Sequence, residues 1–159
     1  MFKKMIVVYD HRVSEKYIEK VKQILSESKI QFELVNDLDN SANDYPLLVK
    51  QAFGVYKKSN ADGMVLLCGS GVGMNMVISK FDGMRGLVAH SEEEAYFARS
   101  HEDANALCFG VGVDDGLREI KPLCRRKMAR IISTFISTEF AGGRHARRVG
   151  QISDIEKEN

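Results

Sequence analysis

Short apolar runs alternate with amphipathic segments along most of the chain. Residues 5–9 (MIVVY) end at Asp10, and apolar side chains then recur at helical spacing from Tyr17 to Leu25, behind Ser14, which can cap a helix. The same strand-then-helix unit repeats, with further helices opening at about Pro46, Gly71 and Ser91. The pattern predicts strands at residues 5–9, 32–35, 64–68, 86–89 and 106–109.

Strands separated by helices indicate a parallel sheet with both faces covered, because parallel strands need crossover connections. We therefore expect an α/β fold: a Rossmann-like three-layer α/β/α sandwich with a five-stranded parallel sheet. A last helix is predicted at about 120–138, with one apolar face that includes Cys124, Met128 and Phe135. No linker interrupts residues 1–159, which we expect to form a single domain with a frayed end at 153–159 (SDIEKEN).

Composition agrees with one globular domain. The 159 residues are 44% apolar and carry 23 Lys and Arg against 22 Asp and Glu, which argues against a disordered or multidomain chain. No apolar stretch is long enough to span a membrane, and residues 5–9 are too short for a signal peptide, so we expect a cytoplasmic protein without a membrane partner. Three cysteines without a Cys-x-x-Cys pair predict neither a disulfide framework nor a zinc site.

Charge is distributed unevenly along the chain. Residues 121–159 carry nine Lys and Arg but only four Asp and Glu. Trp is absent and no basic run is interleaved with aromatic residues that could stack on bases. These cations favour a small anionic ligand over a nucleic acid.

Ligands of open α/β sheets bind outside the carboxyl ends of the strands. There the sequence places Asp10-His11 and the glycine-rich segment 68–73 (CGSGVG). Glycines at such a turn let backbone N–H groups face an anion, but the segment is neither a P-loop nor a complete dinucleotide fingerprint, since Met74 stands where a glycine is needed.

Cys68 is the residue of this turn that could react with a ligand. A thiol near a helix N-terminus has its thiolate favoured and can act as a base or nucleophile, although a buried cysteine at a strand end is an equally good interpretation. If the first and third strands are neighbours, Asp10 and His11 lie beside it; the alternative is that Asp10 only starts a helix.

Two later segments could also take part. His101 ends the fourth predicted helix, where a histidine is more often a helix-capping cation than a catalyst. Arg144 and Arg148, at i and i+4, would share one helical face suited to phosphate, although a solvated charge run is the usual alternative.

Five motifs occur in one order across about residues 5–155. They are Asp10-His11, Asp44-Tyr45-Pro46, Cys68 to Met74, Arg99 to Asn105 and Gly142 to Val149. In this combination the chain resembles the ribose-5-phosphate isomerase B family, which includes the galactose-6-phosphate isomerase subunits.

The resemblance implies aldose–ketose interconversion of a phosphorylated sugar through a cis-enediolate, without metal or other cofactor. Cys68 would be the base, because Met74 stands where some relatives have a Glu base. Asp10 and His101 would assist ring opening. The remaining implied site residues are Ser70 and the N–H groups of Gly69, Gly71, Val72 and Gly73 for the enediolate oxygen, Tyr45 as a pocket wall, and His11, Arg144 and Arg148 for phosphate. The resemblance also implies a homodimer or dimer of dimers whose subunits share active sites.

The chain departs from the family pattern at several positions. Arg12-Val13 replaces Ala-Gly, Gly112 stands where many relatives have Arg, and Glu102 replaces an Asn beside the ring-opening histidine. Glu102 leaves the preferred sugar undecided, because an ionised carboxylate cannot donate a hydrogen bond to a sugar hydroxyl. An allose- or galactose-6-phosphate isomerase is therefore an alternative. The chain could instead be a non-catalytic sugar-phosphate sensor, or a dinucleotide-binding module with Asp37 or Asp39 as its ribose ligand.

Overall fold

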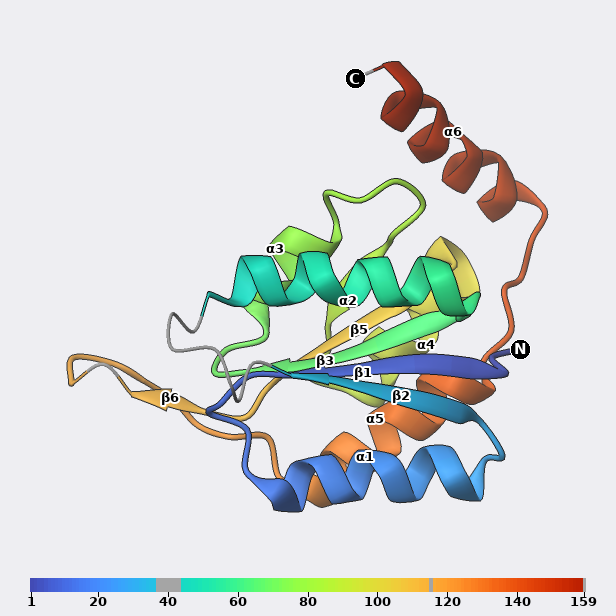
Figure 1. The fold of residues 1–159 in the computed structure, drawn as a ribbon. Coiled ribbons are helices and arrows are strands. Elements are labelled where there is room, and N and C mark those ends of the chain that lie inside the picture. The colour runs from blue at the N-terminus through green and yellow to red at the C-terminus, as the bar shows by residue number, and fades with distance from the viewer. Residues whose placement is uncertain (37–43, 115, 159) are drawn as a thin grey trace.

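The computed structural model describes residues 1–36, 44–114 and 116–158, and Figure 1 shows the course of the chain. Asp37 and Asp39 lie outside the described residues. The helix bounds are α1 Glu15–Glu27, α2 Tyr45–Ser59, α3 Val72–Ile78, α4 Glu92–Glu102, α5 Arg125–Ser137 and α6 Arg144–Glu158. The strand bounds are β1 Lys4–Tyr9, β2 Gln31–Asn36, β3 Gly63–Cys68, β4 Gly86–Val88, β5 Ala106–Gly110, β6 Val113–Asp114 and β7 Glu119–Ile120.

The central sheet has five parallel strands in the order β2-β1-β3-β5-β4. Helices α1, α4 and α5 cover one face, and α2 and α3 cover the other (Figure 1). The predicted α/β/α sandwich is confirmed. The expected adjacency of the first and third strands is confirmed as well, because β1 pairs with β3 and places Tyr9 opposite Leu67.

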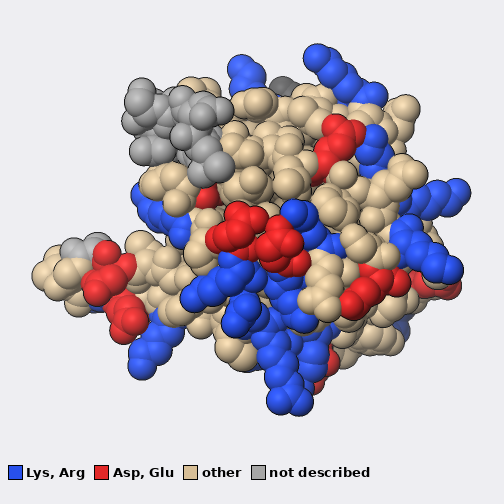
Figure 2. Space-filling model, turned by 60° about the horizontal axis from the view of Figure 1, so that its bottom comes forward, with Lys and Arg blue, Asp and Glu red and all other residues tan. Residues whose placement is uncertain are grey.

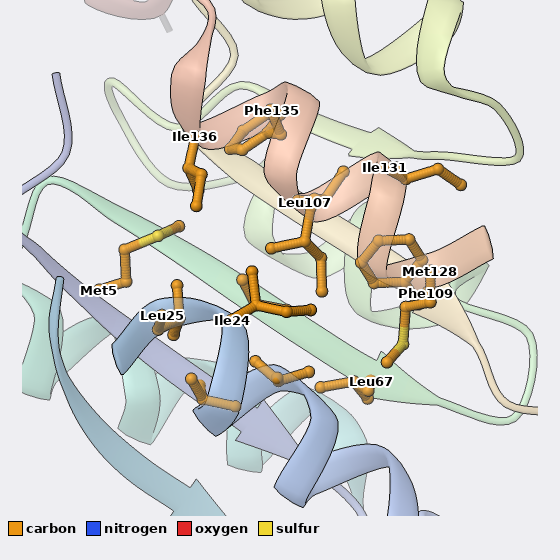
Figure 3. Close-up of a cluster of buried hydrophobic side chains, with 14 of the residues drawn as sticks. Met5, Ile24, Leu25, Leu67, Leu107, Phe109, Met128, Ile131, Phe135 and Ile136 are labelled. Carbon is orange, nitrogen blue, oxygen red and sulfur yellow. The ribbon is translucent and has the colours of Figure 1, made fainter. Parts of the chain in front are cut away.

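The core explains why the apolar runs become the central strands. Every residue of β3 is buried, since both faces of this strand are covered by helices. On one face, Met5, Leu67 and Leu107 pack against Leu25 of α1 and Phe135 of α5 (Figure 3). Truncating one such side chain to alanine costs about 2–5 kcal/mol of stability.

The predicted start of the last helix of the sandwich was wrong. Residues 119–120 pair with residues 113–114 in the small β6-β7 sheet, so α5 begins at Arg125 rather than at about 120. Pro122 lies between them and supplies no N–H for a helix. Cys124 is consequently the exposed N-cap residue of α5 and does not belong to its buried face.

The C-terminal segment is helical, not frayed. Helix α6 extends to Glu158 and leans away from the sandwich (Figure 1). Only His145 of this helix is buried, while Ile152 and Ile155 are 40% and 60% exposed. No helix among the described residues combines the length and apolarity that a membrane crossing needs.

Candidate active site

The first part of the candidate site lies at the carboxyl ends of β1 and β3. Because Tyr9 pairs with Leu67, the next residues, Asp10 and Cys68, end neighbouring strands. The N–H of Asp10 still donates to the carbonyl of Leu67 at 3.3 Å. The two residues are only 1% and 6% exposed, so a carboxyl and a thiol end neighbouring strands in a sheltered position.

The glycine turn after β3 aims backbone N–H groups at this position. The N–H of Gly71 donates to Cys68 Sγ at 3.2 Å, and the N–H of Val72 donates to Ser70 Oγ at 3.2 Å. Gly71 has φ +80°, and a Cβ there would lie 2.9 Å from the carbonyl carbon of Phe109. Only glycine satisfies both conditions, which explains its place in the motif.

The protonation state of Cys68 differs from the sequence expectation. Burial raises the pKa of the Cys68 thiol above its ordinary value, and the negative charge of Asp10 raises it further, while N–H groups such as that of Gly71 lower it. Burial outweighs the helix N-terminus, so these surroundings do not favour the thiolate. The prediction of a favoured thiolate was therefore wrong.

The raised pKa of Cys68 predicts a pH dependence. If the thiolate is the base, its fraction in the free enzyme increases as pH rises toward that pKa, and kcat/KM should increase with it. We expect kcat/KM for a sugar phosphate to rise from pH 7 to pH 9 in steady-state assays, together with the rate of Cys68 alkylation. A kcat/KM that falls over this range would contradict a thiolate base.

Tyr45 and His11 complete this part of the site. Tyr45 is the first residue of α2, and its ring lies 2.9 Å from where a Cβ of Gly73 would be, so it covers the glycine turn. His11 follows Asp10 and is exposed. We call Asp10, His11, Tyr45 and residues 68–73 the thiol half-site.

The other predicted site residues form a second cluster, where α4 ends and α6 begins. The rings of His101 and His145 stack with centroids 4.1 Å apart, and Arg144 Nε donates to His145 Nε2 at 3.3 Å. Burial lowers the pKa of His145, and the charges of His101, Arg144 and Arg148 lower it further, while the charge of Glu102 raises it; the net lowering favours the neutral imidazole, which can accept a hydrogen bond. We call His101, Glu102, Arg144, His145 and Arg148 the histidine half-site.

Within one chain, the two half-sites lie at opposite ends of the parallel strands. Helix α4 returns from β4 to the start of β5, so His101 lies at the amino ends of the strands, whereas Cys68 is opposite Gly110 at the carboxyl end of β5. The length of β5 alone separates the amino and carboxyl ends of the strands by about 13 Å, at roughly 3.3 Å per residue. Figure 1 shows α6 on the side of the N-terminus, away from the strand ends that carry the glycine turn.

Two residues in these clusters were not predicted as site residues. His145 lies against His101, and Arg12 makes an ion pair with Asp10 at 3.2 Å. His145 follows Arg144 in the sequence, and Arg12 follows His11. Their position next to predicted site residues was the signal by which the sequence could have identified them.

A basic groove of about 760 Å³ lies elsewhere, between α1 and α5. Lys16, Lys20 and three arginines of α5 line it, and Figure 2 shows Lys and Arg side chains gathered on one face of the molecule. The groove shares no residue with either half-site. In the part of the chain that the structure describes, no three His, Cys, Asp or Glu side chains gather as ligands for a metal ion.

Comparisons with known proteins agree with the fold and the motifs. Residues 5–152 match the Ribose/Galactose Isomerase family. A putative sugar phosphate isomerase of Bacillus subtilis (strain 168) is 35% identical over 143 residues, which cover 87% of this chain and 88% of that protein. Ribose-5-phosphate isomerase B of Escherichia coli (strain K12) is 34% identical over 114 residues, 72% of this chain and 70% of the relative.

Solved structures resemble the whole chain. Ribose-5-phosphate isomerase B of Clostridium thermocellum superposes with a TM-score of 0.82 at 27% identity, over 98% of both chains. The type B ribose 5-phosphate isomerase of Leishmania infantum gives 0.83 at 28% identity, over 99% of both chains. The chain therefore belongs to the ribose/galactose isomerase family.

Proposed function

We propose that this protein is an aldose–ketose isomerase that interconverts ribose 5-phosphate and ribulose 5-phosphate. Membership of the family and the activity named for its relatives support the reaction class. The observation that carries the mechanism is the sheltered Cys68 thiol with the Gly71 N–H at 3.2 Å and Asp10 beside it. A sugar-phosphate sensor would need no such base.

In the proposed reaction, the Cys68 thiolate takes the proton from C2 of the open aldose. The electron pair of the broken C–H bond forms the C1–C2 double bond of a cis-enediolate, and negative charge develops on the oxygen of C1. Ser70 and the N–H groups of Gly69, Gly71, Val72 and Gly73 hold this oxygen, a type of contact worth about 10²–10³ in rate. The thiol then returns the proton to C1 while the proton of the C2 hydroxyl passes to the oxygen of C1, which gives the ketose.

Ring opening and phosphate binding need groups from both half-sites. Asp10 and His101 would move protons on the ring oxygen and the C1 hydroxyl, Tyr45 would line the pocket, and His11, Arg144 and Arg148 would bind phosphate. Within one chain, His101 and Cys68 lie at opposite ends of the parallel strands. We therefore propose that each site combines the thiol half-site of one subunit with the histidine half-site of another.

The surface of α6 supports a homodimer or a dimer of dimers. This helix exposes Ile152 and Ile155 while burying only His145, and an amphipathic helix normally buries its apolar side. A second subunit would cover these side chains. The three free cysteines suit a reducing compartment, and we place the enzyme in the cytoplasm.

An isomerase assay tests the proposed function. Purified protein with ribose 5-phosphate and EDTA should form ribulose 5-phosphate, and allose 6-phosphate should react more slowly. A protein that binds ribose 5-phosphate but converts no sugar phosphate would be a sensor and would contradict the proposal.

The arginines of α6 should control affinity. Arg144 and Arg148, at i and i+4, are about 40° apart around the helix axis, so both can reach one phosphate, whereas Arg147 is about 100° from Arg148. Replacing either with Met should raise KM for ribose 5-phosphate about tenfold or more, because a hydrogen bond to a charged group is worth about 1.5–3 kcal/mol. Arg147→Met is the matched control; equal increases at all three positions would indicate a diffuse basic surface instead of a phosphate site.

Glu102 favours a second candidate substrate, a six-carbon sugar phosphate. It lies next to His101, and its negative charge acts on the pKa of His145, so its carboxylate belongs to the histidine half-site. If it contacts a sugar hydroxyl, Glu102→Asn should change the ratio of ribose to allose phosphate turnover by more than about fivefold, near the effect of one hydrogen bond. Competition assays measure the ratio. An unchanged ratio would show that Glu102 does not determine the substrate.

A further inference from the structure

Arg12 is held in the thiol half-site by Asp10. The guanidinium Nη1 lies 3.2 Å from Asp10 Oδ2, and the backbone N–H of Arg12 donates to Asp10 Oδ1 at 2.9 Å. The carboxylate is 1% exposed, so it is fixed by its surroundings. Asp10 therefore determines where the guanidinium of Arg12 lies.

The Arg12 side chain also lies along the glycine turn. A Cβ on Gly69 would be 3.6 Å from Arg12 Cδ and 3.6 Å from the carbonyl oxygen of Gly112. Gly69 carries no side chain, and the Arg12 side chain lies close to its backbone. This path brings a cation to the turn whose N–H groups face the Cys68 thiol.

Among the described residues, Asp10 uses only part of the hydrogen-bonding capacity of this guanidinium. An arginine has about five N–H donors, arranged to bind phosphate at two points. Within the described residues, Asp10 is the only partner of the Arg12 guanidinium. The side chain is 49% exposed, so a ligand in solution can reach it.

We propose that Arg12 is a phosphate ligand of the substrate and that Asp10 acts as its positioning residue. This inference rests on the proposed function. It adds Arg12, a cation of the thiol half-site, to the groups that bind the phosphate of the proposed substrate. Phosphate is favoured over the enediolate because Arg12 lies at the half-exposed rim, beside His11, while backbone N–H groups already serve the buried thiol.

Binding of inorganic phosphate tests the proposal without relying on turnover. Isothermal titration of phosphate and of ribose 5-phosphate compares the unmodified protein with Arg12→Met, and Arg125→Met, an exposed arginine of α5, is the matched control. We expect Arg12→Met to reduce the affinity for each ligand about tenfold, the effect of losing one charge-assisted contact. We expect Arg125→Met to leave both affinities unchanged.

A second pair of variants covers the case in which Arg12→Met unfolds because the buried Asp10 loses its counter-ion. Asp10→Asn removes that charge, so phosphate affinity is compared between Asp10→Asn and the double variant Asp10→Asn with Arg12→Met. Asp10→Asn also releases Arg12 from its ion pair, so the double variant should bind phosphate more weakly than Asp10→Asn, but by less than the roughly tenfold expected when Asp10 is present.

Three results would overturn the role of Arg12. They are unchanged phosphate affinity in both comparisons, equal losses in Arg125→Met, and a fall in kcat with phosphate affinity intact, which would assign Arg12 to the enediolate. Failure of the proposed function is a separate result: the unmodified protein would convert no sugar phosphate, whatever its affinity for phosphate.

Discussion

Cys68→Ala should fold, bind ribose 5-phosphate and lose at least about 10²-fold in kcat, the usual contribution of a positioned acid–base group. The expectation follows from the place of the thiol, which is 6% exposed, next to Asp10 and in contact with the Gly71 N–H. Alanine removes the base and leaves the N–H groups of the turn in place, so binding should survive. Steady-state kinetics and titration of ribose 5-phosphate measure the two effects separately.

The other two cysteines are matched controls for this variant. Cys108 is fully buried in β5, so Cys108→Ala should lower the melting temperature and leave kcat nearly unchanged. Cys124 is exposed, so Cys124→Ala should alter neither quantity. Near-normal turnover by Cys68→Ala would contradict the assignment of the base.

Mixing Cys68→Ala with His101→Ala should restore activity that neither variant has alone. In a two-fold symmetric dimer with shared sites, the mixed dimer has one site that carries both changes and one that carries neither. Random exchange makes half of the dimers mixed, so the mixture should reach about a quarter of the unmodified activity. Differently tagged subunits, co-purified before the assay, would show that exchange has occurred.

The control for this mixing experiment takes both changes from one half-site. Cys68→Ala mixed with Asp10→Ala leaves no intact site in any dimer, and it should stay inactive. Equal recovery in both mixtures, or no recovery after demonstrated exchange, would contradict a site shared between subunits.

Much of the fold could be predicted because local and tertiary preferences agree. The runs at 5–9, 64–68 and 106–109 are apolar throughout, as strands covered on both faces must be, and all three lie within central strands of the structure. The end of α6 was predicted to be frayed because a largely polar C-terminal segment looks the same in sequence as a frayed end. The start of α5 was misplaced because the β6-β7 pairing depends on the tertiary course of the chain.

The candidate site was predicted in its parts more than in its arrangement. Asp10 and Cys68 could be placed together because both end neighbouring parallel strands. The separation of His101 from Cys68 follows from the return direction of α4, and the stacking of His101 on His145 joins residues 44 positions apart by a backbone path that no local pattern encodes. The pKa of Cys68 was misjudged because helix position is visible in a sequence, whereas the degree of burial is not.

Proton NMR of ribose 5-phosphate in deuterium oxide tests the central claim most directly, because it follows the transferred proton. The unmodified protein should produce ribulose 5-phosphate, with deuterium at C1 from every turnover in which the Cys68 thiol exchanges its proton with solvent before returning it. Cys68→Ala should produce neither the ketose nor exchange at C2. Ketose formation, or exchange at C2, by Cys68→Ala at the unmodified rate would contradict an isomerase that works through a cysteine base and an enediolate.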